Sequence, residues 1–500
     1  MYAKVYSVVV IGIDTIKIDI EVDAVNGLPN EQIVGLPDKA IRESKNRIKS
    51  AIRNSGFNYP LKSIIINLSP ADIQKEGSLY DLPIAVAILK ATGQLSLSDS
   101  FLIVGELGLD GYIKSIQGTV SIADFINNSN YENLIIPKDN FSETRYFSNI
   151  KVFPIQHLSE ISNLICKSHH IIQTSESKSF SPVNIDFEEV SGQTLAKKAL
   201  EIAVVGKHNM LFSGSPGCGK TMLMKRIPSI LPALSKNKAI ECLKIHCLTK
   251  HKDTSVDLSY HPPFLSPHHS TSLIGLVGGG KRPMPGIISQ CHNGVLFLDE
   301  FPEFSKQAIE ALRQPLEDKI ITISRSQYTL TFPASFQLVL CMNPCPCGYL
   351  HHEYVDCQCS STMIKRYRQK ISGPILDRID MVLHLKQNCS HNLDSKASQL
   401  SSKVMKNNIV QALEFKKSRM NFDQKNIHSI NKLSEIGQVS SSAKELIKQF
   451  LDSHQMSSRS LNSLLKISRS IADLKQQVNI TESSVLEAYQ FKNNLGTNSF

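Results

Sequence analysis

Residues 209–221, which read NMLFSGSPGCGKT, decide how the rest of the chain is organised. Their apolar start predicts a buried strand, and a turn containing three glycines follows it. Lys220 and Thr221 complete the pattern G-x-x-x-x-G-K-T, and residues 222–226 can continue as a helix. In this strand–loop–helix order, backbone N–H groups and the helix N-terminus surround a phosphate. We therefore expect an α/β module whose loop binds a nucleoside triphosphate.

The polar residues of this loop have distinct expected roles. Lys220 can reach the β- and γ-phosphates, and the hydroxyl of Thr221 can ligate Mg²⁺. A chance glycine-rich turn would not explain why strand, motif and helix occur together. The residues expected to hold the nucleotide are Gly214, Ser215, Pro216, Gly217, Cys218, Gly219, Lys220 and Thr221.

Two further strands of the same module end in polar residues. Residues 294–300, GVLFLDE, predict a buried strand followed by two acids, about 80 residues after the loop. Asp299 can share Mg²⁺ with Thr221, and Glu300 can orient and deprotonate the attacking water. Residues 336–343, FQLVLCMN, predict another buried strand. Asn343, at the carboxyl end of that strand, is in the position of a γ-phosphate sensor.

Cys345, Cys347, Cys357 and Cys359 form two C-x-C pairs separated by nine residues. Four thiols in two close pairs suit tetrahedral Zn²⁺. The spacing is tighter than the commoner C-x-x-C, so cysteines that merely pack or stay reduced are the alternative. The chain has 11 cysteines and no apparent secretion signal, which argues against disulfides.

The composition is that of a soluble protein with several domains. The chain has 500 residues, of which 41% are hydrophobic and 20% charged. It contains neither a signal-peptide core nor a run of about 20 apolar residues, so we expect a cytoplasmic protein without membrane contact. The net charge of +10 favours polyanionic partners weakly.

Changes in pattern along the chain predict four segments. Residues 1–168 form a first domain, the serine-rich residues 169–185 a linker, and residues 186–392 the nucleotide-binding core. Residues 393–500 are predicted to be helical, and from residue 400 onward they carry 14 basic and eight acidic side chains. The helices expected there span residues 403–415, 441–452, 460–475 and 481–491.

Together with CMNPCPCGY at 341–349 and GPILDRID at 373–380, these motifs carry a resemblance over essentially the whole chain. The chain resembles the ComM/YifB family of magnesium-chelatase-like AAA+ ATPases. The resemblance implies an AAA+ P-loop module with a parallel sheet between helices, an N-terminal Lon-protease-like α+β domain and a C-terminal helical lid. It also implies ATP and Mg²⁺ as cofactors, and a ring, usually a hexamer, with ATP bound between neighbouring subunits.

The Lon-like resemblance rests on KEGSLYDLPIA at 75–85 and VGELGLDGYIKSIQG at 104–118. Lon proteases use a serine–lysine dyad, which this chain does not match. Leu79 stands at the nucleophile position, Ser121 comes too late, and Lys114 lies before the turn that should lead to the lysine. The domain is therefore expected to be inactive as a peptidase and to serve in binding or assembly.

The family match also implies roles for three polar residues. Asn343 is similar to sensor 1, Arg378 to the arginine finger that reaches into the adjacent subunit, and Arg459 to sensor 2 on the lid. For Arg378, the alternative is a structural salt bridge with Asp377 or Asp380. Arg469 lies in the same segment as Arg459 and competes for its role.

Relatives in this AAA+ branch carry hairpins that line the pore of the ring, here residues 273–286 and the hairpin tipped by 325–328. Lys281, Arg282 and Arg325 are the expected DNA contacts. The implied activity is ATP-driven branch migration of DNA during natural transformation and recombination. The alternative is a chelatase-type motor that remodels a protein partner, and we expect the chelatase subunit to lack the Lon-like front domain.

Overall fold

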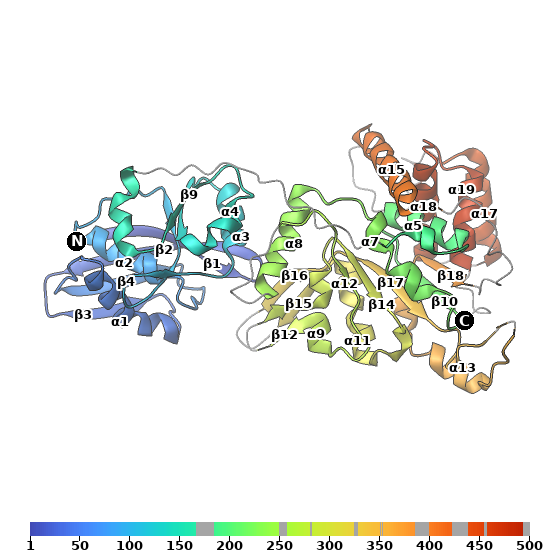
Figure 1. The fold of residues 1–500 in the computed structure, drawn as a ribbon, viewed down its shortest axis with the longest axis horizontal. Coiled ribbons are helices and arrows are strands. Elements are labelled where there is room, and N and C mark those ends of the chain that lie inside the picture. Colours follow the sequence, from blue (N-terminus) through green and yellow to red (C-terminus); the bar gives the residue numbers. More distant parts are fainter. Residues whose placement is uncertain are drawn as a thin grey trace. The chain divides into compact units, whose positions relative to one another are not determined.

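The computed structural model describes residues 1–166, 185–249, 258–280, 283–324, 329–350, 352, 354–385, 400–422, 439–454 and 458–493 (Figure 1). The described part of the chain divides into two compact units. The first unit comprises Met1–Lys178 with Leu243–Ser259, and the second comprises Ser179–Cys242 with Tyr260–Phe500.

The first unit is built on a mixed sheet of seven strands in the order β3-β4-β2-β1-β5-β8-β9. Strands β1 and β2 alternate buried and less buried residues, the pattern expected of a sheet with one face on a core. The strands are β1 Tyr2–Ile11, β2 Asp14–Val25, β3 Asn30–Val34, β4 Ser63–Ser69, β5 Phe101–Ile103, β8 Asn133–Pro137 and β9 Lys151–Ile155, with β6 Glu106–Leu107 and β7 Ile113–Lys114 forming a separate pair.

Helices α1 and α2 pack together, and α2 lies against β1 and β2. Asp38 caps α1 by accepting a hydrogen bond from the Ile41 amide at 2.8 Å. Helix α2 is apolar almost all round and accordingly lies in the core of the unit. The helices of this unit are α1 Lys39–Asn54, α2 Asp81–Ala91, α3 Thr119–Asn127 and α4 Phe141–Thr144.

The residues weighed for a Lon-type dyad lie in separate surroundings. Ser121 is buried within α3, with 3% of its surface exposed. Lys114 forms an ion pair with Glu106 at 3.7 Å. The inactivity of this unit as a peptidase remains a prediction.

The second unit contains a sheet of five strands in the order β11-β14-β17-β10-β18. Every neighbouring pair is parallel, and β10, β14 and β17 are buried along their whole length. Such continuous apolar strands are typical of parallel sheets covered on both faces. The strands are β10 Met210–Gly214, β11 Phe264–Leu265, β14 Val295–Leu298, β17 Gln337–Met342 and β18 Met381–Leu385.

Short helices and two hairpins surround this sheet. The hairpin predicted with its tip at 325–328 is confirmed in its two strands, β15 Ile320–Ser324 and β16 Thr329–Pro333. The sequence of residues 229–292 has no clear period and predicts an irregular segment, which is wrong for α8 Lys236–Thr249. The other elements are α5 Thr194–Gly206, α6 Lys220–Met224, α7 Ile227–Ile230, α9 Leu273–Val277, β12 Gly278–Gly279, β13 Met284–Pro285, α10 Ile287–Gln290, α11 Lys306–Ala311, α12 Arg313–Asp318, α13 Ser361–Arg368 and α14 Gly373–Leu376.

All four helices predicted near the C-terminus are confirmed. They are α15 Ser402–Phe422, α17 Ser441–His454, α18 Ser458–Leu474 and α19 Glu482–Asn493. In Figure 1 they lie beside α5 and β18, and side chains such as Ile409, Leu464 and Phe491 join one hydrophobic core with Leu200 and Met381. In the described part of the chain, no helix has the length and apolar character that a membrane crossing requires.

Candidate nucleotide and metal sites

The polar residues predicted to act on a nucleotide meet at one edge of the parallel sheet. Parallel strands bring their carboxyl ends to the same edge, where α/β proteins bind ligands. Strand β10 leads into the glycine-rich loop, β14 into Asp299 and Glu300, and β17 into Asn343. Strand β17 lies between β10 and β14, so Asn343 comes between the loop and the two acids.

Lys220 is held by the loop in which it lies. Its Nζ donates to the carbonyl oxygens of Gly214 at 2.7 Å and Ser215 at 2.9 Å, and to Asn343 Oδ1 at 3.2 Å. Gly217 and Gly219 have φ values of +78° and +89°, a backbone conformation that residues other than glycine rarely adopt. Among the described residues, no atom lies within 4 Å of a Cβ added at either glycine, so the loop is open there. This arrangement fits a triphosphate.

Thr221 and Asp299 form the second part of the site. The Thr221 hydroxyl donates to Asp299 Oδ2 at 2.8 Å. A hydroxyl and a carboxylate in contact are the ligands with which nucleotide-binding loops hold Mg²⁺. The donor set therefore fits the magnesium ion that accompanies ATP.

Glu300 is placed differently from Asp299. Its backbone has φ of +49°, an uncommon conformation for glutamate, and its side chain is 58% exposed. The Nδ1 atom of His269 lies 3.4 Å from Glu300 Oε2. Because this histidine comes from a proline- and histidine-rich stretch without period, nothing in the sequence pointed to the contact. His269 thus belongs to the surroundings of the predicted general base.

Comparison with known proteins bears on the whole chain. Three family profiles match the chain. Residues 186–393 match the profile "Magnesium chelatase, subunit ChlI", and residues 20–140 match "Subunit ChlI of Mg-chelatase". Residues 399–492 match "Magnesium chelatase, subunit ChlI C-terminal". Uncharacterized protein YifB of Salmonella typhimurium and competence protein ComM of Haemophilus influenzae are each 37% identical to this chain, over 98% of this chain and 97% of their own lengths. A Mycobacterium tuberculosis protein is 33% identical over 98% of both chains.

The chain belongs to the ComM/YifB family of magnesium-chelatase-like AAA+ proteins. ATP and Mg²⁺ are the cofactors that this family implies. That the chelatase subunit lacks a Lon-like front domain remains a prediction.

The two arginines that the family resemblance singled out lie together. Arg378 Nη2 and Arg459 Nη2 both contact Oε1 of Glu317, the latter at 2.8 Å. Arg378 is therefore paired with Glu317, rather than with Asp377 or Asp380 as the alternative supposed. Its side chain is 6% exposed, and among the described residues its Nε has no hydrogen-bond partner.

Arg378 is remote from the glycine-rich loop of its own chain. The side-chain amide of Asn209 donates to the backbone oxygen of Arg378 at 2.9 Å, and Asn209 directly precedes β10. The loop follows the other end of this strand, about 17 Å away at roughly 3.3 Å per residue. That distance exceeds the reach of an arginine side chain. The Arg378 side chain therefore cannot contact a nucleotide in its own loop.

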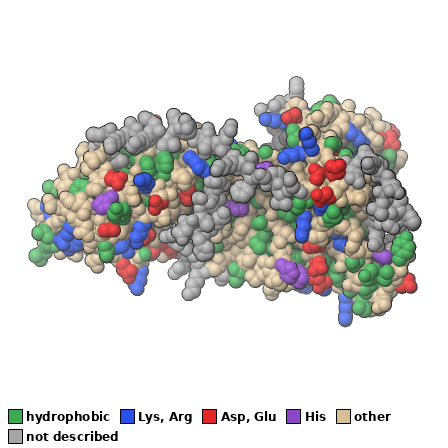
Figure 2. All heavy atoms as spheres, in the orientation of Figure 1, with side chains coloured by type: hydrophobic (Ala, Val, Ile, Leu, Met, Phe, Trp, Pro, Cys, Tyr) green, Lys and Arg blue, Asp and Glu red, His purple; other side chains and the backbone are tan. Residues whose placement is uncertain are grey.

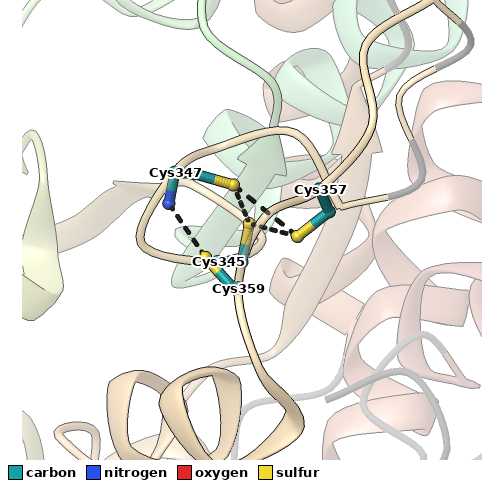
Figure 3. Close-up of side chains that lie close together, drawn as sticks. All are labelled: Cys345, Cys347, Cys357 and Cys359. Atoms are coloured by element: carbon teal, nitrogen blue, oxygen red, sulfur yellow. Dashed lines mark hydrogen bonds between the residues drawn. The ribbon is translucent and has the colours of Figure 1, made fainter.

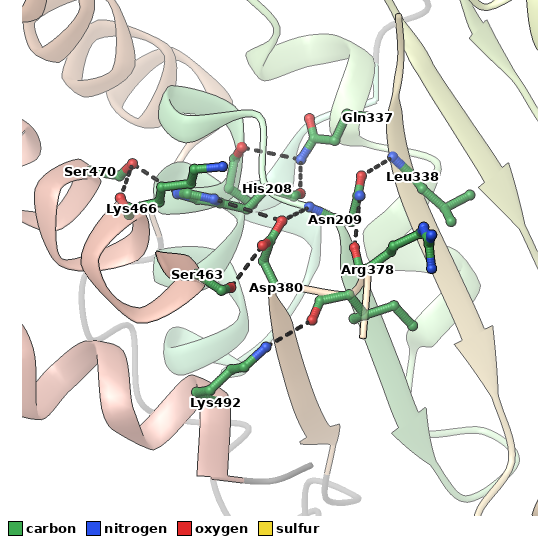
Figure 4. Close-up of polar contacts among 12 residues, drawn as sticks. His208, Asn209, Gln337, Leu338, Arg378, Asp380, Ser463, Lys466, Ser470 and Lys492 are labelled. Carbon is green, nitrogen blue, oxygen red and sulfur yellow. Dashed lines mark hydrogen bonds and ion pairs between the residues drawn. The ribbon is translucent and has the colours of Figure 1, made fainter. Parts of the chain in front are cut away.

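A partly buried polar cluster fixes this amino edge of the sheet (Figure 4). Asp380 accepts hydrogen bonds from the Asn209 amide at 3.0 Å and from the Ser463 hydroxyl of α18 at 2.7 Å. His208 Nε2 lies 2.8 Å from the Ser470 hydroxyl, also on α18. Burial lowers the pKa of His208 to about 4, so this imidazole is neutral near pH 7. The cluster joins α18 to the strand that follows Arg378.

The four predicted cysteine ligands converge (Figure 3). Cys345 Sγ lies 3.4 Å from Cys347 Sγ and 3.6 Å from Cys357 Sγ, while Cys359 Sγ accepts a hydrogen bond from the Cys347 amide. All four sulfurs lie within 4.8 Å of one another. Four sulfurs at about 2.3 Å from one tetrahedral ion would be roughly 3.8 Å apart. The cluster can hold a metal ion.

Backbone N–H groups around the cluster favour charged sulfurs. Hydrogen bonds from Tyr349 and Gln358 reach Cys347, and the first of these is the main reason that the Cys347 pKa is lowered to about 6. Burial instead raises the pKa of Cys345, which adjoins the Cys347 thiol. A thiolate at neutral pH is the form that binds metal.

Three predicted residues, Lys281, Arg282 and Arg325, lie outside the described residues. The strands β12, β13, β15 and β16 that flank them are described. On the face drawn in Figure 2, the Lys and Arg side chains of the described residues are interspersed with Asp and Glu. The DNA contacts remain predictions.

Proposed function

We propose that this protein is an ATP-hydrolysing ring motor, most simply a hexamer, that moves DNA in branch migration. The observation that carries the proposal is the convergence of Lys220, Asn343, Thr221 and Asp299 at the carboxyl edge of the sheet. A bound magnesium ion would supply the charge that offsets the phosphate oxygens. Lys220 holds the phosphate, and Thr221 and Asp299 hold the ion.

Hydrolysis requires a base and a further positive charge. Glu300 is exposed beside the site and takes the proton of the attacking water, while Asn343 positions the phosphate end. Arg378 cannot reach its own loop, so it acts on the nucleotide of a neighbouring copy, and Arg459, which shares Glu317 with Arg378, is the proposed sensor 2. A finger supplied by the neighbour makes hydrolysis depend on ring assembly.

Two observations support DNA as the substrate. A relative that covers nearly the whole chain is named a competence protein, in Haemophilus influenzae. The net charge is +10, which favours a phosphate backbone as partner. Lys281, Arg282 and Arg325 are the proposed contacts, and the process is recombination during natural transformation, in the cytoplasm.

The remaining predictions complete the proposed architecture. Residues 1–168 form an inactive Lon-like domain for binding or assembly, residues 169–185 a linker, residues 186–392 the AAA+ core, and residues 393–500 the helical lid. The cysteine cluster binds structural Zn²⁺, which its sulfur-to-sulfur distances support.

A second candidate function is ATP-driven remodelling of a protein partner. The chelatase-subunit profiles that match residues 186–393 and 20–140 favour it. The two candidates share the nucleotide site and differ in the substrate that stimulates hydrolysis.

The test measures ATP hydrolysis without DNA, with single-stranded DNA and with branched DNA, over a range of salt concentrations. We expect stimulation by DNA that weakens steeply as salt rises, because binding releases counterions from the phosphates. The double change Lys281→Ala and Arg282→Ala should lower the ratio of stimulated to basal rate. Full stimulation in this variant would indicate that the hairpin carrying Arg325 makes the DNA contact instead. No stimulation by any DNA would instead favour the protein-remodelling function.

A further inference from the structure

The turn that carries the first cysteine pair lies directly on the phosphate-binding loop. Gly348 follows Cys347, and its amide donates to the carbonyl oxygen of Cys345 at 3.0 Å. Its φ is +85°, and a Cβ added there would lie 2.6 Å from Cδ and 2.7 Å from Cγ of Pro216. Pro216 is part of the glycine-rich loop. A side chain at position 348 would overlap the Pro216 ring, so the turn and the loop pack closely together at this point.

The cysteine segment is attached to the nucleotide site at both of its ends. Asn343 precedes Cys345 by two residues, and its Oδ1 accepts a hydrogen bond from Lys220. Helix α13 begins two residues after Cys359 and carries Tyr367, whose phenol oxygen is hydrogen-bonded by the backbone of Asn343. Burial raises the pKa of Tyr367 to about 12, so the phenol stays neutral. The cysteine segment therefore contacts the nucleotide site at three points, through Asn343 before the cluster, Gly348 within it and Tyr367 after it.

We infer that the metal ion held by the four cysteines sets the conformation of the phosphate-binding loop, so that zinc occupancy controls the affinity for nucleotide. This rests on the proposed function in two respects, ATP binding at the loop and Zn²⁺ binding at the cluster. Without an ion, the four crowded sulfurs no longer share a centre, and the 345–348 turn loses the link that ties its two cysteines to Cys357 and Cys359. A shift of the turn at Gly348 would therefore alter the position of the phosphate-binding loop, because the backbone of Gly348 lies close to the Pro216 ring.

The experiment measures bound zinc by elemental analysis and the Kd of a fluorescent ATP analogue by titration. Cys357→Ser should lose zinc and weaken nucleotide binding by about tenfold, as expected when a displaced loop loses about one hydrogen bond to the charged phosphates. Gly348→Ala should keep zinc and weaken binding to a similar extent, because the added Cβ pushes Pro216 away. This second variant leaves all four ligands in place, so it tests the contact even if Cys357→Ser folds poorly.

Two matched controls separate this coupling from general damage. Gly56→Ala introduces the same backbone strain at φ of +84°, but no described atom lies within 4 Å of its added Cβ. Cys247→Ser removes a cysteine outside the cluster. Both controls should bind zinc and nucleotide like the wild type. Unchanged nucleotide affinity in zinc-free Cys357→Ser or in Gly348→Ala would overturn the inference, as would wild-type protein without stoichiometric zinc. Failure of the zinc-loaded wild type to bind any nucleotide would instead overturn the proposed ATPase function.

Discussion

At the scale of single residues, Lys220 and Glu300 should separate binding from turnover. Lys220 points into the loop, with hydrogen bonds to Gly214 and Ser215, whereas Glu300 lies outside it and is largely exposed. We expect Lys220→Ala to abolish nucleotide binding, because it removes the charge that holds the phosphates. Glu300→Gln should bind nucleotide normally and hydrolyse it roughly 10²- to 10⁴-fold more slowly, since an amide cannot accept the proton.

Both variants can be compared by nucleotide titration and by phosphate release. The amide of Glu300→Gln preserves the size and polarity of the side chain, so it is the matched change at this position. Turnover by Glu300→Gln near the wild-type rate would show that another group activates the water. His269, at 3.4 Å from Glu300, would be the next residue to test.

At the scale of elements, helix α18 is fastened to the amino edge of the sheet along one face. Arg459, Ser463 and Ser470 point from this helix toward Glu317, Asp380 and His208, respectively. Residues spaced by four, seven and eleven positions lie on the same side of an α-helix. The position of α18 therefore determines the position of Arg459 relative to Arg378.

The buried His208 makes this junction sensitive to acid. Its pKa is about 4 in the folded protein, below the ordinary value of 6.5, so the unfolded chain binds a proton between these pH values and the folded chain does not. Stability is therefore lost as pH falls through this window, by on the order of 3 kcal/mol in total. Asp380, Lys416 and Lys466 also act on this imidazole.

We expect the melting temperature of the second unit to fall between about pH 7.5 and about pH 5 in the wild type. His208→Gln can still hydrogen-bond with Ser470 but does not titrate, so its melting temperature should fall less over the same range. An equal fall in both proteins would show that other groups cause the acid sensitivity. Differential scanning calorimetry at the two pH values makes the comparison.

At the scale of the whole molecule, the distance between Arg378 and its own loop predicts complementation between inactive copies. Arg378→Ala should slow hydrolysis by about 10³-fold or more, and Lys220→Ala should be inactive. When the two variants are mixed, some neighbouring copies combine an intact Lys220 with an intact Arg378. Random equal mixing would restore up to about a quarter of the sites.

Rates of ATP hydrolysis as a function of the mixing ratio test this prediction. A maximum near equal amounts is expected, and mixing Arg378→Ala with the double variant Lys220→Ala/Arg378→Ala is the control that should stay inactive. A mixture that remains as inactive as its components would contradict the action of Arg378 across a subunit boundary.

Several features follow from the sequence because they are local. The conformation of the loop at 214–221 and the position of the acids after β14 can each be predicted from a few consecutive residues. The structure brings Lys220, Thr221, Asp299 and Asn343 together as the motif spacing predicted. The four C-terminal helices were visible in their 3.6-residue periodicity, whereas α8 was missed because its apolar residues follow no clear face.

Other features depend on the tertiary structure, because they join side chains far apart in sequence that share no periodic pattern. Glu317 forms ion pairs with Arg378 and Arg459. His269 contacts Glu300, and Gly348 packs against Pro216. An isolated charge or glycine does not indicate its partner in the sequence, because the pairing arises only when strands and helices pack in a particular order. The sequence by itself thus determined which residues can carry the chemistry, and only the packed sheet placed Arg378 at the edge opposite its own nucleotide site.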